Sequence, residues 1–155
     1  MQSIPVFPSS FGISDFPQKL GYHFPAEFAE HSGTWLSWPH KKASWPGKID
    51  KIYPIYAQFI KAVAEGELVN INIVDEQMRY AVINQLQQVD CSLLNIRFHY
   101  NPTNDAWCRD HGPAFLINKE AGKFKKVIVD WGYNAWGDKY PPYELDDVVP
   151  TSIGE

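Results

Sequence analysis

The segment from Asn104 to Pro113 gathers most of the side chains that could do chemistry. It reads Asn-Asp-Ala-Trp-Cys-Arg-Asp-His-Gly-Pro, and so combines two carboxylates with an indole, a guanidinium and an imidazole. A carboxylate beside an indole suits a planar cation, because guanidinium forms paired hydrogen bonds to carboxylate and the ring adds about 0.5–2 kcal/mol of cation–π attraction. The same composition also fits an internal ion pair between Arg109 and an aspartate, with the other aspartate capping the loop.

A second segment of similar texture runs from Asn134 to Tyr140 and reads Asn-Ala-Trp-Gly-Asp-Lys-Tyr. Glycine in such a segment lets the backbone approach a ligand closely, although the segment alone also fits an ordinary turn. The whole chain is 15% aromatic with six Trp. Such rings either enter cores or line sites that grip flat or cationic groups, and the sequence leaves both interpretations open.

The cysteines and histidines give weaker signals. Cys91 is expected to be a small buried hydrophobic residue, and Cys108 has only His111 near it in sequence, with no group to orient that base. We therefore expect neither thiol to be a nucleophile. The five histidines do not form the close His/Cys pairs of a zinc site, so we expect no metal, and no motif implies an organic cofactor.

Composition excludes several classes of function. The 155 residues are one ordinary domain, and the formal charge of -4, without any Lys/Arg run longer than two, argues against a nucleic-acid surface. No stretch approaches the roughly 18 apolar residues of a membrane span. With two cysteines and no leader-like segment, we expect a cytoplasmic protein.

Hydrophobic periodicity predicts the elements that carry these segments. An alternating strand over 34–38 is followed by a helix over 48–65, with Pro54 expected in its first turn, and then by a strand over 67–74. A second helix over 76–89 and a strand over 96–100 complete a β-α-β-α-β order. The chain is therefore predicted to be α/β.

The rest of the chain is less regular. Loop 104–112 precedes two strands, 113–118 and 125–131, which a hairpin turn at 120–122 should join. Loop 132–143 follows, and a helix starts at Glu144, which Pro150 or Gly154 would interrupt. Residues 1–20 are interpreted as an N-terminal tail or arm, separate from 21–155.

Four blocks, taken together, resemble the agmatine deiminases and the related Porphyromonas-type peptidyl-arginine deiminases. They are Phe-Pro-Ala-Glu-Phe-Ala-Glu-His at 24–31 with Thr-Trp-Leu-Ser-Trp-Pro at 34–39, the segment 104–113, Val-Asp-Trp at 129–131, and the segment 134–140. The resemblance extends from about Gly21 to the last residue. It implies the pentein fold, an α/β propeller, of which this length would supply about two of the five ββαβ-like blades.

The resemblance also implies roles for particular residues. Asp110 matches the carboxylate that holds the guanidinium, and Trp107 matches the ring beside it. Trp136 would line the pocket from the second loop. Supporting positions of the first motif are Asn104, Asp105 and Arg109. The implied partner is a small guanidine substrate, agmatine, converted to N-carbamoylputrescine and ammonia on a route to putrescine.

Two features of the family are missing from these residues: the C-terminal nucleophilic cysteine segment and the mid-chain histidine base. We therefore expect residues 21–155 to be the N-terminal portion of a truncated guanidine-deiminase catalytic domain, inactive alone and prone to self-association through open sheet edges. Other interpretations are a peptidyl-arginine deiminase, which makes citrulline, and a non-catalytic cation-binding or assembly module. A metal-dependent hydrolase is a further alternative and would require stoichiometric metal.

Overall fold

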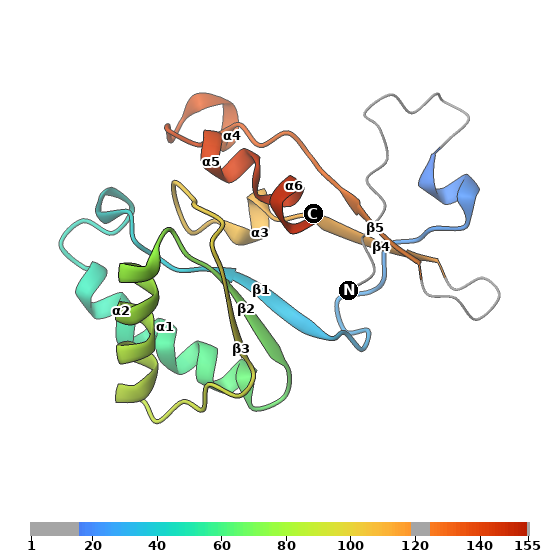
Figure 1. The fold of residues 1–155 in the computed structure, drawn as a ribbon. Helices are drawn as coiled ribbons and strands as arrows, with labels where there is room; N and C mark the ends of the chain where they lie inside the picture. Colours follow the sequence, from blue (N-terminus) through green and yellow to red (C-terminus); the bar gives the residue numbers. More distant parts are fainter. Residues whose placement is uncertain (1–15, 119–124, 155) are drawn as a thin grey trace.

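A computed structural model describes residues 16–118 and 125–154 of the chain, and Figure 1 traces its elements. Within these residues the strands form two sheets, a three-stranded sheet in the order β1-β2-β3 and a two-stranded sheet of β4 and β5. The α/β class predicted from the sequence is confirmed. Short helical turns cluster around the smaller sheet and above the larger one (Figure 1).

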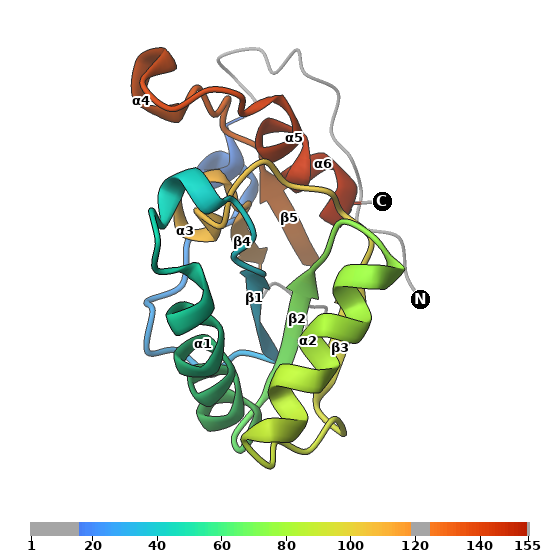
Figure 2. The same cartoon turned by 90° about the vertical axis from the view of Figure 1, so that its left-hand side faces the viewer.

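The larger sheet follows the predicted β-α-β-α-β order. Its elements are β1 (Gly33–Ser37), α1 (Ile49–Ala64), β2 (Leu68–Asn72), α2 (Glu76–Gln88) and β3 (Ile96–His99). All pairings are parallel. Figure 2 shows α1 and α2 side by side on one face of this sheet, which is the arrangement that two successive crossovers of the same hand produce.

The core lies between that sheet face and the two helices. Strand residues alternate between faces, so Val69 and Ile71 point to the helices, whereas Asn70 and Asn72 point to the opposite face. Fully buried side chains of both helices complete the core, including Ile60 of α1 and, from α2, Val82 and Leu86.

The prediction for Pro54 is wrong by one turn. Helix α1 begins at Ile49, so Pro54 lies in its second turn rather than its first. Proline there removes the N–H that would bond the Asp50 carbonyl. Both residues are exposed, so water can reach that carbonyl, and the apolar face of the helix fixes its start despite the proline.

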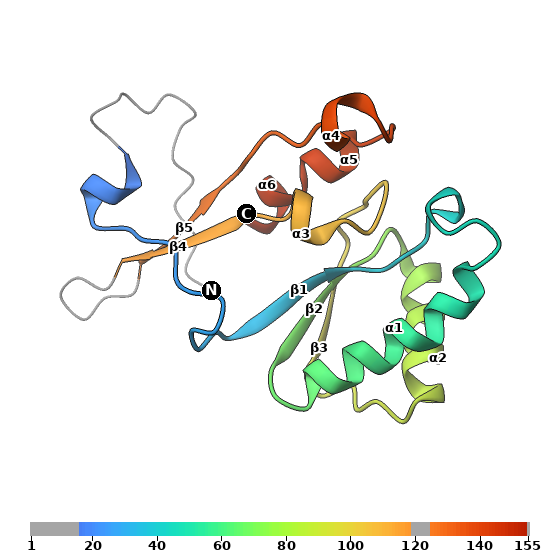
Figure 3. The same ribbon diagram turned by 180° about the vertical axis from the view of Figure 1, so that it is seen from behind.

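The two remaining strands, β4 (Ala114–Asn118) and β5 (Lys125–Val129), pair antiparallel as predicted. The expected turn at 120–122 lies outside the described residues. A 3-10 turn at Pro17–Leu20 precedes His23, whose backbone exchanges hydrogen bonds of 3.0 Å with Ile117. Figure 3 shows this N-terminal segment next to β4 and β5.

Besides the turn at Pro17–Leu20, the described residues contain five short helical turns. They are η3 (Lys42–Ser44), α3 (Cys108–His111), α4 (Ala135–Asp138), α5 (Glu144–Asp147) and α6 (Val149–Gly154). The segment predicted as loop 104–112 thus contains one helical turn, and the predicted C-terminal helix is divided in two. In Figure 2, α3, α5 and α6 lie beyond the carboxyl end of β2. Among residues 16–118 and 125–154, none of the helices has the length and apolar character needed to cross a membrane.

Candidate functional site

One carboxylate of the first predicted loop, Asp105, is used internally. The residue is only 4% exposed, and its side chain accepts hydrogen bonds from the hydroxyl of Ser44 and from the Ala106 N–H at 2.8 Å. The Lys41 Nζ lies 3.8 Å from the same carboxylate. These contacts fix Asp105 within the protein, so its role is to hold the loop.

The other carboxylate of this loop, Asp110, is exposed. Among the described residues it accepts no hydrogen bond and forms no ion pair. The N–H of Asp110 bonds the Trp107 carbonyl at 2.9 Å, which begins the single turn of α3. Trp107 is the residue that precedes this turn, and its indole is 40% exposed.

The internal ion pair that composition also suggested for Arg109 does not form. The Arg109 guanidinium pairs instead with Glu27 at 2.5 Å, and both side chains are largely exposed. Exposed pairs of this kind contribute about 0–1 kcal/mol. The pair connects α3 to the segment before β1 and takes the guanidinium away from Asp110.

The second loop makes an unusual left-handed turn. Four consecutive residues of α4 have positive φ, at 47° for Ala135, 59° for Trp136, 76° for Gly137 and 62° for Asp138. Only glycine adopts this region without cost, and other residues pay about 1–2 kcal/mol each. Asn134 stabilises the turn, because its side-chain oxygen accepts the Gly137 N–H at 2.9 Å. Strain of this kind is typical of functional sites.

The left-handed turn brings the two predicted loops together. The rings of Trp107 and Trp136 meet edge to face, with centroids 5.4 Å apart and planes at 89°. Trp136 also contacts Tyr133 at 5.9 Å and Tyr140 at 5.8 Å. We call these four rings the aromatic wall. Trp136 is 49% exposed, so the wall presents ring surface to solvent.

Tyr133 was not predicted as a site residue, and its electrostatics show what surrounds the wall. Burial and then the negative charges of Asp146, Asp110 and Asp105 raise its pKa to about 12. Three carboxylates therefore act on one phenol, and the same field attracts a cation. The alternation of Tyr133 and Trp131 with glycine and asparagine was the only sequence signal available for it.

His111 lies behind the wall. It is 1% exposed, both ring nitrogens lack a hydrogen-bond partner within the described part of the chain, and its ring meets Tyr133 edge to face at 6.0 Å. Burial lowers the pKa of His111 to about 4. The imidazole is thus neutral at ordinary pH and acts as packing behind the wall.

Neither cysteine is activated. Cys91 is buried in the core as predicted, and Cys108 packs against the same core. Burial is the largest cause of a raised pKa for both thiols. A nucleophilic cysteine needs the opposite shift. Across 16–118 and 125–154, no three His, Cys, Asp or Glu side chains are grouped closely enough to hold a metal ion.

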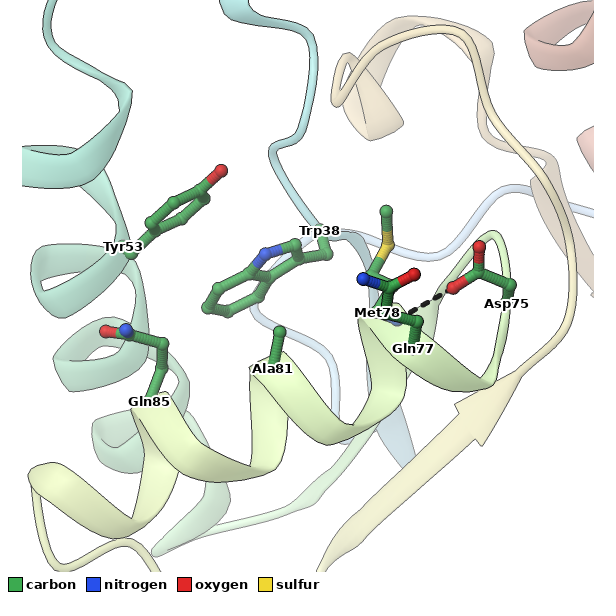
Figure 4. Close-up of a pocket in the computed structure, with 7 residues that line it drawn as sticks. All are labelled: Trp38, Tyr53, Asp75, Gln77, Met78, Ala81 and Gln85. Atoms are coloured by element: carbon green, nitrogen blue, oxygen red, sulfur yellow. Dashed lines mark hydrogen bonds between the residues drawn. The ribbon is translucent and has the colours of Figure 1, made fainter.

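A cavity of about 330 Å³ lies elsewhere, between α1 and α2 (Figure 4). None of the six predicted site residues lines it. Its carboxylate, Asp75, is already occupied as the N-cap of α2, accepting the Met78 N–H at 2.7 Å. The chemistry of the two loops is therefore separate from this cavity. It is lined by Trp38, Tyr53, Asp75, Gln77, Met78, Ala81 and Gln85.

Solved structures with this arrangement define the class. An agmatine deiminase of Enterococcus faecalis superposes with a TM-score of 0.75 at 30% identity, covering 88% of this chain and 36% of that one. A C. jejuni agmatine deiminase with substrate bound gives a TM-score of 0.68 at 27% identity, covering 85% of this chain and 36% of that one. The fold is that of the α/β guanidine-modifying deiminases.

Sequence comparison narrows the class to a family. The Porphyromonas-type peptidyl-arginine deiminase model matches residues 23–155, and this chain belongs to that family. An agmatine deiminase of Ectopseudomonas mendocina is 36% identical over 145 residues, which are 91% of this chain. The chain spans just over a third of the curated relatives it matches, 36% of one and 37% of another.

Proposed function

We propose that residues 21–155 are the N-terminal portion of the catalytic domain of an agmatine-deiminase-type hydrolase, preceded by an arm at 1–20. In this proposal the chain supplies about two of the five blades of a pentein propeller and the cation-binding part of the active site. Asp110, Trp107 and Trp136 contact the substrate. Asn104, Asp105 and Arg109 support the first loop.

The proposal depends mainly on one observation: the carboxylate of Asp110, unpaired among the described residues, follows Trp107 by three residues, and its charge acts on Tyr133, whose ring contacts Trp136. A guanidinium placed there would form paired hydrogen bonds to the carboxylate and lie against exposed indole. The other two carboxylates near the wall, Asp105 and Asp146, already accept hydrogen bonds from the protein. Asp110 is therefore the member of this group that is left for a ligand.

The reaction follows from the chemistry of guanidines. A cysteine thiolate attacks the guanidinium carbon, ammonia leaves, and water then releases the ureido product and regenerates the thiol. The nucleophile and the histidine base are assigned to parts of the protein outside these residues, because both cysteines here have raised pKa values. Asp110 would hold the guanidinium protonated, which keeps its carbon electrophilic.

Charge favours agmatine over free arginine. Two cations near the site are already paired, Lys41 with Asp105 and Arg109 with Glu27, and the Lys139 ammonium lies 5.3 Å from the centre of the Tyr140 ring. The carboxylate of free arginine would meet the negative charges of Asp146, Asp110 and Asp105, which agmatine, lacking that group, would not. A peptidyl-arginine lacks that carboxylate at the same position, so a peptidyl-arginine deiminase is the second candidate, and the family match supports it.

The test compares Asp110→Asn with Asp90→Asn in the protein at the full length that its gene encodes. Both changes replace one exposed carboxylate, but Asp90 lies at the far end of α2 with φ 53°, a conformation that asparagine tolerates. Ureido product from agmatine, arginine and an arginine peptide is measured. We expect agmatine to be the best substrate.

Asp110→Asn should lower kcat/KM roughly 30- to 5,000-fold, which corresponds to about 2–5 kcal/mol for truncating one side of a desolvated charge pair. Asp90→Asn should leave the rate unchanged. Turnover of Asp110→Asn at the rate of the control would show that the cation is held elsewhere. Preference for the peptide over agmatine would favour the second candidate, and binding of agmatine without any ureido product would indicate a non-catalytic module.

A further inference from the structure

The two site loops are held together by two consecutive acidic residues of α5, Asp146 and Asp147. Asp146 is 1% exposed, and its Oδ1 accepts the backbone N–H of Asn104 at 2.7 Å and that of Asp105 at 3.2 Å. Asp147 accepts the backbone N–H of Tyr133 at 2.5 Å. One short turn thus bonds both loops, each through main-chain amides.

The bond to the first loop is reciprocal. The Asn104 side-chain oxygen accepts the N–H of Leu145 at 2.8 Å, so α5 both donates to this loop and accepts from it. Hydrogen bonds to backbone N–H groups fix the path of the chain more directly than hydrogen bonds between two flexible side chains. Asp105 begins the segment that reaches Trp107 two residues later and Asp110 three residues after that.

The bond to the second loop acts on the aromatic wall. Tyr133 precedes Trp136 by three residues and contacts its ring, while the Trp136 ring contacts Trp107 of the first loop. The two loops therefore meet at α5 on one side and at the indole pair on the other. His111 of the first loop also meets the Tyr133 ring at 6.0 Å, so the bonds to α5 act together with ring contacts to hold the two loops.

Asp146 also contributes charge. Burial raises its pKa, while the N–H groups of Asp105 and Asn104 oppose that shift. After burial, its charge contributes most to the raised pKa of Tyr133, ahead of the charges of Asp110 and Asp105. Asp146 therefore sits where an anion both bonds the first loop and adds to the field at the wall.

We propose that Asp146 and Asp147 are positioning residues that set the separation of the Trp107–Asp110 turn from Trp136, and through it the fit of the guanidinium. The proposal depends on the proposed function for its consequence in catalysis. It does not depend on that function for its structural consequence, the Trp107–Trp136 contact. Two readouts therefore separate the two ideas.

The structural readout is near-ultraviolet circular dichroism of the indole pair. The difference between the wild-type spectrum and that of Trp136→Phe identifies the band of the coupled rings. Asp146→Ala and Asp147→Ala should each lose most of this band, because the loop that carries one indole is released. Asp146→Asn should keep more of it than Asp146→Ala, since the amide oxygen can still accept the two N–H groups.

The catalytic readout is ureido formation from agmatine by the protein at the full length that its gene encodes. The matched control is Glu144→Gln, an exposed carboxylate of the same turn that accepts the neighbouring Tyr143 N–H at 3.0 Å. We expect Asp146→Ala to lower kcat/KM about 10- to 100-fold, the effect of misplacing a reacting group by about 1 Å. Asp146→Asn should recover part of that loss, and Glu144→Gln should match the wild type.

The outcomes decide between the ideas. The proposal would be overturned if both Asp146→Ala and Asp147→Ala retained the circular-dichroism band of the indole pair, whatever their rate of ureido formation. If Asp146→Ala does not fold, Asp147→Ala decides, because it removes one hydrogen bond at a half-buried site and the chain should still fold. Lost bands together with no ureido product from the wild type would keep the positioning role and refute the deiminase function.

Discussion

Buried His111 makes the stability of this chain sensitive to mild acid. In the folded state burial lowers its pKa from the ordinary 6.5 to about 4. An unfolded chain takes up a proton on this imidazole near pH 6.5, whereas the folded chain does not do so until about pH 4. Between these values the unfolded state binds more protons, so the free energy of unfolding must fall as the pH falls.

The size of this effect follows from the difference in pKa. The folded-state pKa lies about 2.5 below the ordinary value, and each pKa unit corresponds to 1.36 kcal/mol, which gives about 3 kcal/mol. This stability is present above pH 6.5 and is lost as the pH falls through about 4. A loss of this size is a large fraction of the 5–15 kcal/mol typical of a domain.

The assay is urea unfolding at several pH values between about 7.5 and 4.5, on the wild type and on His111→Phe, which keeps a ring against Tyr133 without a titrating group. We expect the free energy of unfolding of the variant to fall less steeply with acid. His31→Gln is the control. The Ala29 carbonyl and Glu67 raise the pKa of His31, so its contribution is present at low pH and is lost as the pH rises.

Equal slopes for the wild type and His111→Phe would refute the reasoning. They would mean that His111 finds a hydrogen-bond partner or water in solution and titrates near its ordinary pKa. Loss of the pH dependence in His31→Gln would contradict the opposite sign expected for His31 and would show that His31, not His111, causes the acid response. Either result would also remove the argument that the imidazole is neutral packing behind the aromatic wall.

Two further predictions concern α3. Gly112→Ala should lower the free energy of unfolding, measured by urea titration, by about 1–3 kcal/mol. The new Cβ would lie 2.3 Å from the Cys108 carbonyl oxygen, so the turn would have to shift. An unchanged urea midpoint would contradict this prediction. Cys108→Ala should leave ureido formation by the full-length product of the gene nearly unchanged. Because burial raises the pKa of Cys108, the wild-type thiol should also react with iodoacetamide more slowly than free cysteine does. Loss of turnover in Cys108→Ala would instead show that Cys108 is a nucleophile.

The elements that match their predicted bounds best are those whose apolar residues repeat over many positions. The helix expected over 76–89 is α2, Glu76–Gln88, because its apolar residues repeat at helical steps and Asp75 caps its start. The strand expected over 67–74 is β2, Leu68–Asn72. The asparagines at 70 and 72 were not used in that prediction, although their spacing of two shows that one face of β2 is polar.

The sequence indicated residue types for a candidate site but not their geometry. Trp107 and Trp136 were placed in two loops, yet nothing local in the sequence states that their rings meet. The left-handed turn that brings them together contains one glycine among four residues, so the usual signal for positive φ is weak there. Asn134 was the available indication, because asparagine side chains often hydrogen-bond the backbone of a following turn.

The distribution of hydrogen bonds among the aspartates explains how several carboxylates can share one small region. Asp146 and Asp105 are both buried, and each accepts backbone N–H groups, which offset the cost of an anion away from water. The repulsion among the three carboxylates is then left uncompensated at Asp110, which is exposed and has no partner among the described residues. A cation at Asp110 would relieve that repulsion as well as pair with the carboxylate, so the buried aspartates would strengthen cation binding at the proposed site. Asp146 lies 41 positions after Asp105 and was not among the site residues predicted from the sequence, because only the folded chain brings its carboxylate to the first loop.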